Sequence, residues 1–258
     1  MVLLDALGIM LVIVIPTILA ILLFAWWFRA SNKAATYRPA WAYSGKLEAL
    51  VWAIPALVIL FLGGVAWTGA HDLDPARPIA SPRRALEVEV VSLDWRWLFI
   101  YPDQHIATIN RLVIPVGTPV NLRITSASVM NVFFVPRLSS EIYAMNGMVT
   151  QLNLLGSETG TFPGLSAQFS GDGFADMAFD TVVATPADFA AFVESAHAAT
   201  SRLDAAEYRV LSKQSHERRV QVFGSVSDGL FEDIVSLRLP PGSGPSLAPV
   251  SDTTTGAH

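Results

Sequence analysis

The 258-residue sequence contains no cysteine, and this absence excludes several kinds of chemistry at once. Disulfide bonds, cysteine-ligated metal, thiol catalysis and a lipidated N-terminal cysteine all need a thiol. Basic residues are also few, because 17 lysines and arginines stand against 22 aspartates and glutamates, for a formal net charge of −5. With no basic stripe in the sequence, nucleic acid is not a predicted partner.

Histidine is scarce as well, and its spacing does not suggest a metal site. No two of the five histidines are three or four residues apart, the spacing that places two ligands on one helix face. The phosphate-binding glycine loop, the G-x-S-x-G elbow and the H-E-x-x-H motif are also missing. We interpret the histidines as surface or linker residues; they are His71, His105, His197, His216 and His258.

Long hydrophobic runs are plentiful, and they account for much of the 52% hydrophobic composition. Residues 7–28 carry no charge, and residues 47–67 carry only Glu48, at the start of the run. Each run is long enough to cross a hydrocarbon core about 30 Å thick. Pro16 and Pro55 lie inside the runs, where a membrane helix packed against neighbours tolerates a kink. The sequence therefore predicts a transmembrane hairpin over residues 1–70.

The charges between the two runs predict the orientation of the hairpin. The connection holds four basic residues and no acid, which places it in the cytoplasm by the positive-inside rule. The N-terminus and everything after His71 then lie outside the cytoplasm. The first run is longer than a signal-peptide core and no small-x-small site follows it, so we expect it to be retained. The basic residues are Arg29, Lys33, Arg38 and Lys46.

The pattern changes to that of short strands after a Pro-rich linker, residues 71–85. Apolar and polar residues alternate over 86–90, 93–97, 120–125 and 151–154, with turn signals between the runs. Val90 and Val91 interrupt the alternation, which we interpret as a bulge. Residues 86–184 are therefore predicted to form a β-sandwich.

The end of the chain is predicted to be helical and then unstructured. Thr185 followed by Pro186 is a helix start, and a second helical piece is expected near residues 228–237. Together these define a helical extension over residues 185–240. Residues 241–258 have almost nothing to bury and are predicted to be a disordered tail.

One aromatic stretch, DWRWLFIYP, leaves two interpretations open. Its alternating rings form either an electron-relay surface or a stripe that faces the core, and the alternation favours the core stripe. The four rings are Trp95, Trp97, Phe99 and Tyr101.

Three motifs carry a resemblance to a known family. They are SLDWRWLFIYPDQHIATIN, SVMNVFFVPRLSSEIYAMNGM and GTFPGLSAQFSGDGFADM. With two membrane spans before an external β-sandwich, the chain resembles subunit II of the haem–copper respiratory oxidases, in particular the bo-type quinol-oxidase branch. The resemblance implies a cupredoxin-like fold for residues 86–184. Members of this type commonly carry a lipidated cysteine after a signal peptide. This sequence shows neither, so its N-terminus is either natively different or not fully represented.

The resemblance also identifies where a copper centre lies in the cytochrome c-oxidising branch. There an early histidine and a late C-x-E-x-C-x-x-x-H-x-x-M segment hold two copper ions. On this chain only the methionine of that pattern is retained; serines replace the thiolates, and serine is not a ligand for soft copper. The corresponding positions, which we expect not to be ligands, are Asn131, Ser166, Gln168, Ser170, Phe174 and Met177.

Glu48 has two interpretations. A carboxylate in the first turn of a membrane helix is often there because the helix dipole favours it. The resemblance adds that the glutamate of the segment KLEALVW lies near the cytoplasmic mouth of a proton-uptake pathway in subunit I of the family.

The resemblance implies a subunit without a redox centre in a proton-pumping quinol oxidase of the bacterial inner membrane. No cofactor is expected in this chain; haems and one copper are expected in subunit I. Expected partners are this subunit, further small membrane subunits and membrane lipid, with quinol reached through the complex. Ubiquinol and menaquinol are not distinguished. The alternative is a membrane-anchored β-sandwich that acts as a binding or sensor module, while the missing thiolates disfavour a copper electron-transfer subunit.

Overall fold

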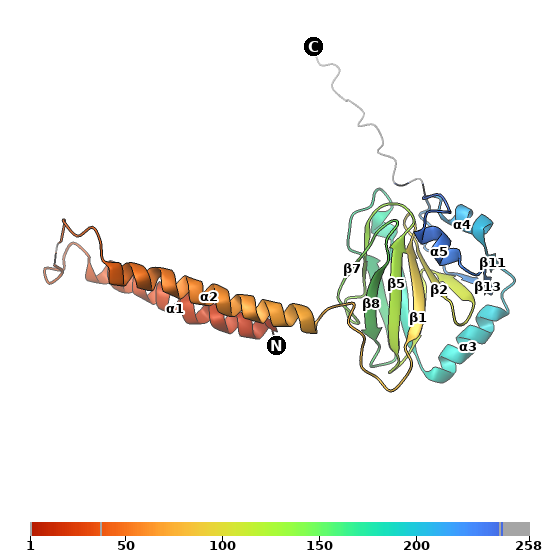
Figure 1. Cartoon of the computed structure of the whole chain (residues 1–258), viewed down its shortest axis with the longest axis horizontal. Coiled ribbons are helices and arrows are strands. Elements are labelled where there is room, and N and C mark those ends of the chain that lie inside the picture. The colour runs from red at the N-terminus through yellow and green to blue at the C-terminus, as the bar shows by residue number, and fades with distance from the viewer. Residues whose placement is uncertain (1, 37, 243, 245–258) are drawn as a thin grey trace, which may run out of the picture. The chain divides into compact units, whose positions relative to one another are not determined.

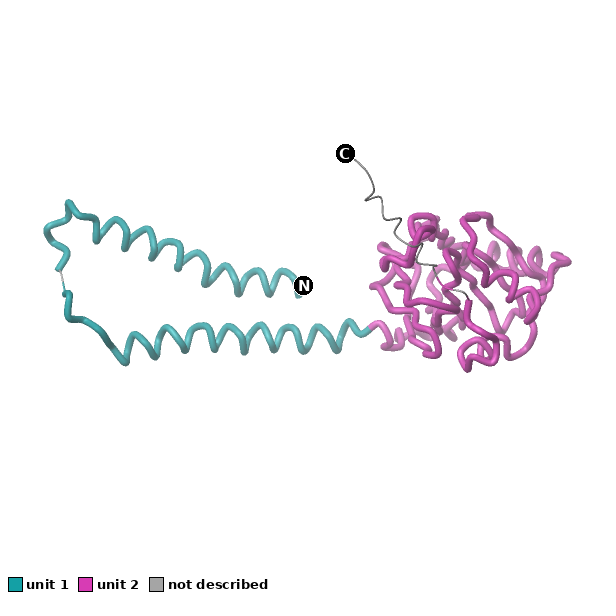
Figure 2. Tube along the Cα trace, turned by 90° about the horizontal axis from the view of Figure 1, so that it is seen from above, with its two compact units in different colours: residues 1–74 teal, residues 75–258 magenta. Residues whose placement is uncertain are grey.

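The computed structural model describes residues 2–36, 38–242 and 244, and it divides into two compact units at Asp74. The first unit is a pair of long helices joined by a loop, the teal part of Figure 2. The second unit, residues 75–258, holds the strands. The predicted tail, residues 241–258, lies almost entirely outside the described residues.

The helical unit consists of α1 (Val2–Trp27) and α2 (Gly45–Asp72). Both are long and apolar enough to cross a membrane, and their lengths correspond to about 40 Å at 1.5 Å per residue. Pro16 and Pro55 lie within helices that continue on both sides of them, as predicted. Almost every apolar side chain of the helix pair is exposed, so the surface of the pair must be covered by lipid or by other helices.

The second unit is built on a β-sandwich of two sheets (Figure 1). The six-stranded sheet has the order β12-β3-β2-β1-β5-β8, and the five-stranded sheet has the order β4-β10-β9-β6-β7. The strands of the first are β1 (Leu86–Ser92), β2 (Trp97–Tyr101), β3 (Ile106–Ile109), β5 (Pro119–Ser126), β8 (Thr150–Leu155) and β12 (Gln221–Phe223). Those of the second are β4 (Arg111–Pro115), β6 (Asn131–Phe134), β7 (Ile142–Ala144), β9 (Gly160–Ser166) and β10 (Ala178–Ala184).

The aromatic stretch faces the core between the sheets, as the alternation favoured. The indole of Trp97 meets Phe133 and Phe179 at centroid distances of 5.3 and 5.7 Å, and Phe99 meets Phe179 at 5.2 Å. The Tyr101 hydroxyl is also buried, donates to the Val113 carbonyl at 3.1 Å and accepts from its N–H at 2.8 Å. The Trp97 indole Nε1, by contrast, is buried without a hydrogen-bond partner among the described residues.

The predicted bulge at Val90 and Val91 is wrong. Strand β1 runs without interruption and pairs in register with β2 and β5. Of the second predicted strand, residues 93–97, only Trp97 belongs to a strand, as the first residue of β2. Residues 93–96 form the turn that joins β1 to β2, closed by the Leu93 N–H to Arg96 carbonyl bond at 2.9 Å. The alternation failed as a signal because both faces of these strands are buried, so consecutive apolar residues need no bulge.

The C-terminal extension covers the outer face of the six-stranded sheet. Helix α3 (Pro186–His197) begins as predicted, with the Thr185 hydroxyl accepting from the Asp188 N–H at 3.1 Å. The predicted second helix is α5 (Leu230–Val235). Four elements of this extension were not predicted: α4 (Ala205–Leu211) and the strands β11 (Arg202–Leu203), β12 and β13 (Ser225–Val226). Of these, β12 joins the six-stranded sheet, so the extension is not purely helical. Tyr208, Phe231 and Ile234 form a second core against Leu98 and Ile109 of the sheet.

Candidate functional site

The positions matched to the copper pattern lie where β6 meets the end of β9. These strands are antiparallel, with Phe133 opposite Ser166, so Asn131 lies beside the loop that follows β9. The Ser166 hydroxyl donates to Asn131 Oδ1 at 3.1 Å, and the Ser166 N–H donates to the Met177 carbonyl at 3.2 Å. Asn131, Ser166 and Met177 are all buried. Hydrogen bonds thus link Ser166 of β9 to Asn131 on one side and to Met177 on the other.

The other three positions are held differently. The backbone carbonyl of Gln168 accepts from the Ser166 hydroxyl at 3.3 Å. Ser170 is buried, and its hydroxyl has no partner among the described residues. Phe174 begins the short 3₁₀ helix η1 (Phe174–Asp176) and packs on Phe169, with centroids 5.7 Å apart. Phe169 itself is 71% exposed.

The donor set at this place does not fit copper. It consists of an amide, hydroxyls and one thioether, with no thiolate in the chain and no imidazole among the matched positions. In the part of the chain that the structure describes, no group of three or more histidine, aspartate or glutamate side chains is arranged to hold a metal ion. The interpretation of these six residues as the positions of a former copper centre stays a prediction.

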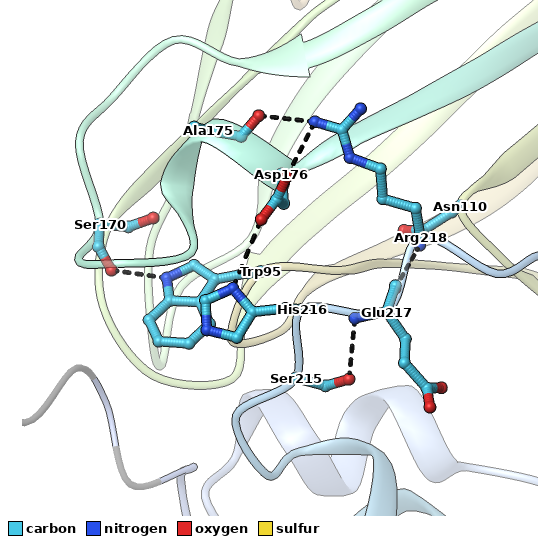
Figure 3. Close-up of polar contacts among 9 residues, drawn as sticks. All are labelled: Trp95, Asn110, Ser170, Ala175, Asp176, Ser215, His216, Glu217 and Arg218. Carbon is cyan, nitrogen blue, oxygen red and sulfur yellow. Dashed lines mark hydrogen bonds and ion pairs between the residues drawn. The ribbon is translucent and has the colours of Figure 1, made fainter.

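A segment from far along the chain crosses this loop (Figure 3). The His216 ring stacks on Trp95 with centroids 4.9 Å apart, and its Nδ1 lies 3.4 Å from Asp176 Oδ2. Arg218 Nη2 donates to the Ala175 carbonyl at 2.8 Å and pairs with Asp176 Oδ1 at 3.2 Å. We call these contacts of His216 and Arg218 with Asp176 the loop clasp.

Trp95 connects the clasp to the loop. Its backbone φ is +70°, unusual for a bulky residue, and its indole Nε1 donates to the Ser170 carbonyl at 2.9 Å. The ring lies directly over Gly173, where an added Cβ would come within 2.2 Å of it. Sequence reasoning treated His216 as a surface residue, and no local signal reveals a contact with partners 40 residues away.

A buried carboxylate on the other sheet was also missed. Glu89 of β1 accepts from Arg123 Nη1 at 2.7 Å, and the same nitrogen pairs with Glu232 of α5 at 3.0 Å. Burial, and then the charge of Glu232, raise the pKa of Glu89 to about 7, while Arg123 opposes that rise. Glu89 lines a cavity of about 270 Å³ together with His105 and the start of α5.

Glu48 lies in the first turn of α2, as predicted. It is exposed, and no side-chain hydrogen bond or ion pair joins it to another described residue. Its backbone N–H donates to the Ser44 carbonyl at 3.0 Å, which is the first bond of the helix. The carboxylate is thus free to contact solvent or another chain.

Comparison with known proteins agrees with this architecture. Residues 96–185 match the family described as "Cytochrome C oxidase subunit II, periplasmic domain", and residues 197–237 match the "COX Aromatic Rich Motif". The second match covers the part of the C-terminal extension that contributes His216 and Arg218 to the loop clasp, and it also includes α5.

Two curated relatives are similar over most of the chain. The "Cytochrome bo(3) ubiquinol oxidase subunit 2" of Pseudomonas putida is 48% identical over 90% of this chain and 74% of its own length. The "Ubiquinol oxidase subunit 2" of Acetobacter aceti is 50% identical over 88% of this chain and 74% of its own. Among solved structures, the periplasmic domain of subunit II of cytochrome oxidase of Bradyrhizobium japonicum matches 45% of this chain and 96% of that one, at 23% identity and a TM-score of 0.43. On the identity to the curated relatives, this chain belongs to the family of ubiquinol oxidase subunit 2 proteins.

Proposed function

We propose that this chain is the subunit II, without a redox centre of its own, of a proton-pumping terminal quinol oxidase. The observation that carries the proposal is the near 50% identity to ubiquinol oxidase subunits across both the helical hairpin and the β-sandwich. The chain is an inner-membrane protein whose C-terminal domain is periplasmic. The comparisons lend no support to the alternative of a free sensor module.

The chemistry is assigned to other subunits. Quinol oxidation and oxygen reduction to water would take place in subunit I, which would hold the haems and a copper, and further small membrane subunits would complete the complex. A quinol is apolar and reaches a site within the bilayer, so an electron relay through an external domain is not needed. This accounts for a cupredoxin-like domain whose matched positions hold serine, asparagine and phenylalanine instead of ligands.

The role of the domain would be structural. Its loop between β9 and η1 is tied to β6 through Ser166 and Asn131 and to the C-terminal extension through the loop clasp. These bonds hold the loop without metal, and we propose that they let the domain cover and brace subunit I.

We further propose that Glu48 admits protons at the cytoplasmic face. In support, it is an exposed carboxylate in the first turn of α2, at the end of the helix that joins the cytoplasmic loop. Glu48→Gln keeps size and hydrogen bonding but removes the proton carrier, so oxygen consumption per haem should fall while assembly survives, and Glu48→Asp should retain more activity. If Glu48 only stabilises the helix start, Glu48→Gln leaves turnover at the parental rate.

The whole proposal is tested by purifying the complex through a tag on this chain. We expect haem-containing subunits to co-purify, a visible spectrum of haem and oxygen consumption driven by quinol. A colourless chain that purifies by itself would contradict the proposal.

A further inference from the structure

The loop between the two membrane helices forms a basic hollow that the proposed function does not use. The hollow has a volume of about 700 Å³ and lies where α1 ends and α2 begins. Its lining combines two arginines with apolar and aromatic side chains, including Phe28, Arg29, Asn32, Arg38, Trp41 and Leu47.

Arg29 is held in place at the edge of this hollow. Its Nη1 donates to the Trp26 carbonyl at 2.7 Å, its Nε donates to the Ser31 hydroxyl at 3.1 Å, and its guanidinium lies 4.9 Å from the Trp26 ring centre. These bonds leave Nη2 without a partner in the described part of the chain. A guanidinium fixed in this way loses little conformational freedom when it binds an anion.

The loop backbone is ordered around the same point. The Asn32 side chain donates to the Trp27 carbonyl at 2.6 Å, and its backbone N–H donates to the Arg29 carbonyl at 2.9 Å. Asn32 thereby closes the C-terminal end of α1 and keeps the loop folded back over it.

No acid neutralises the hollow. Arg38 has no ion pair with any described residue, and the sequence contains no aspartate or glutamate between Asp5 and Glu48. Glu48 does not line the hollow. Two like charges that share one hollow repel each other, so a bound anion is favoured by both.

The surroundings favour a phospholipid over a free anion. The hollow lies at the end of two membrane-spanning helices on the cytoplasmic side, where the phosphate plane of the inner leaflet meets the protein. Phe28, Trp41 and Leu47 provide an apolar wall, which suits a glycerol backbone and the first methylenes of acyl chains but not a hydrated phosphate ion.

We propose that this hollow binds the headgroup of an anionic phospholipid from the cytoplasmic leaflet. Arg29 and Arg38 pair with the phosphate oxygens, because the guanidinium fork matches their geometry. The apolar wall contacts the glycerol end of the lipid.

The test uses the purified oxidase complex, stripped of lipid and then titrated with phosphatidylglycerol or phosphatidylcholine while bound lipid is counted by native mass spectrometry. We expect phosphatidylglycerol to bind more tightly than phosphatidylcholine. Arg29→Gln and Arg38→Gln should each weaken phosphatidylglycerol binding about fivefold, and their combination more. Excess inorganic phosphate should not displace the lipid.

Lys33 of the loop and Lys46 in the first turn of α2 provide a matched control, because they carry the same charge nearby but do not line the hollow. The double variant Lys33→Gln/Lys46→Gln should bind phosphatidylglycerol like the parent. Arg29→Lys/Arg38→Lys keeps the charge and is measured in place of the glutamine variants if those fail to assemble; the loss of the guanidinium fork should still weaken phosphatidylglycerol binding.

Three results would overturn the proposal. Equal losses of phosphatidylglycerol binding in the arginine and lysine variants would mean that the overall positive charge of the loop attracts the lipid. Displacement by phosphate would identify a simple ion site. Unchanged lipid binding in all arginine variants would mean that another occupant, such as a carboxylate of a neighbouring subunit, fills the hollow in the complex.

Discussion

The buried carboxyl of Glu89 should make the periplasmic domain less stable as the pH rises. Its side chain is 10% exposed, and its pKa is raised from 4.5 to about 7 in the folded domain. At about 1.4 kcal/mol per pKa unit, this difference corresponds to roughly 3 kcal/mol. Because Glu89 lines a cavity that water can enter, we reduce the expected effect to about 2 kcal/mol.

The sign follows from proton binding. Between pH 4.5 and about 7 the folded domain holds the Glu89 proton and the unfolded chain has lost it, so the free energy of unfolding falls as the pH rises. Below pH 4.5 the Glu89 carboxyl does not lower the free energy of unfolding. Above about pH 7 it lowers the free energy of unfolding by the full amount. Glu89→Gln stays neutral throughout and keeps an oxygen that accepts from Arg123, so at pH 8 we expect it to be about 2 kcal/mol more stable than the parent.

The measurement is urea unfolding of a fragment that contains residues 75–258, across this pH range. Glu87→Gln is the matched control, because Glu87 is a less buried glutamate on the same strand and its charge is the smallest contribution to the raised pKa of Glu89, so its loss should shift the pH window only slightly. Glu232→Gln should move the window to lower pH, since the Glu232 charge contributes to the raised pKa. If Glu89→Gln and the parent lose stability in parallel as the pH rises, the buried carboxyl is not the cause and the reasoning fails.

Three further predictions concern the loop and the tail. Gly173→Ala should destabilise the domain by about 1–3 kcal/mol, because the new methyl would collide with the Trp95 ring, while Asp172→Ala in the same loop should not; urea unfolding compares them. The domain over residues 75–258 should fold without stoichiometric copper by elemental analysis, and Asn131→His, Ser166→Cys, Gln168→Glu, Ser170→Cys and Phe174→His combined should create a coloured copper centre. A folded, colourless product would show that the assumed register is wrong. Removing residues 245–258, which contain few apolar side chains, should leave haem content and thermal stability unchanged; a large loss of haem would contradict this.

Elements with a strong local signal were predictable from the sequence. Two uncharged runs gave α1 and α2, and Thr185 followed by Pro186 gave the start of α3. Alternation over residues 120–125 identified β5, because the polar residues Asn121 and Arg123 of this strand lie on its less buried face. These signals work because each depends on a physical property of neighbouring residues.

Features created by distant residues were not predictable in this way. The loop clasp joins Asp176 to His216 and Arg218, some 40 residues later, and nothing in the local spacing announces it. Glu89 has the sequence context of a solvent-facing residue, and it is buried only because Arg123 and α5 cover it. The turn at residues 93–96 was mistaken for a strand because its apolar and polar residues alternate as in a half-exposed strand, although Asp94 and Arg96 are buried in the fold.

The bonds that hold the loop after β9 come from different parts of the chain. A metal centre concentrates its strength at one point, where loss of a single ligand can release the whole loop. In this chain β6 holds Ser166, Trp95 holds the Ser170 carbonyl, and the C-terminal segment holds Asp176. Each such bond contributes about 1 kcal/mol, so the loop keeps most of its order when any one is removed. The C-terminal extension is therefore part of the loop's support, because it supplies one of these three attachments and its His216 ring covers Trp95, which supplies another.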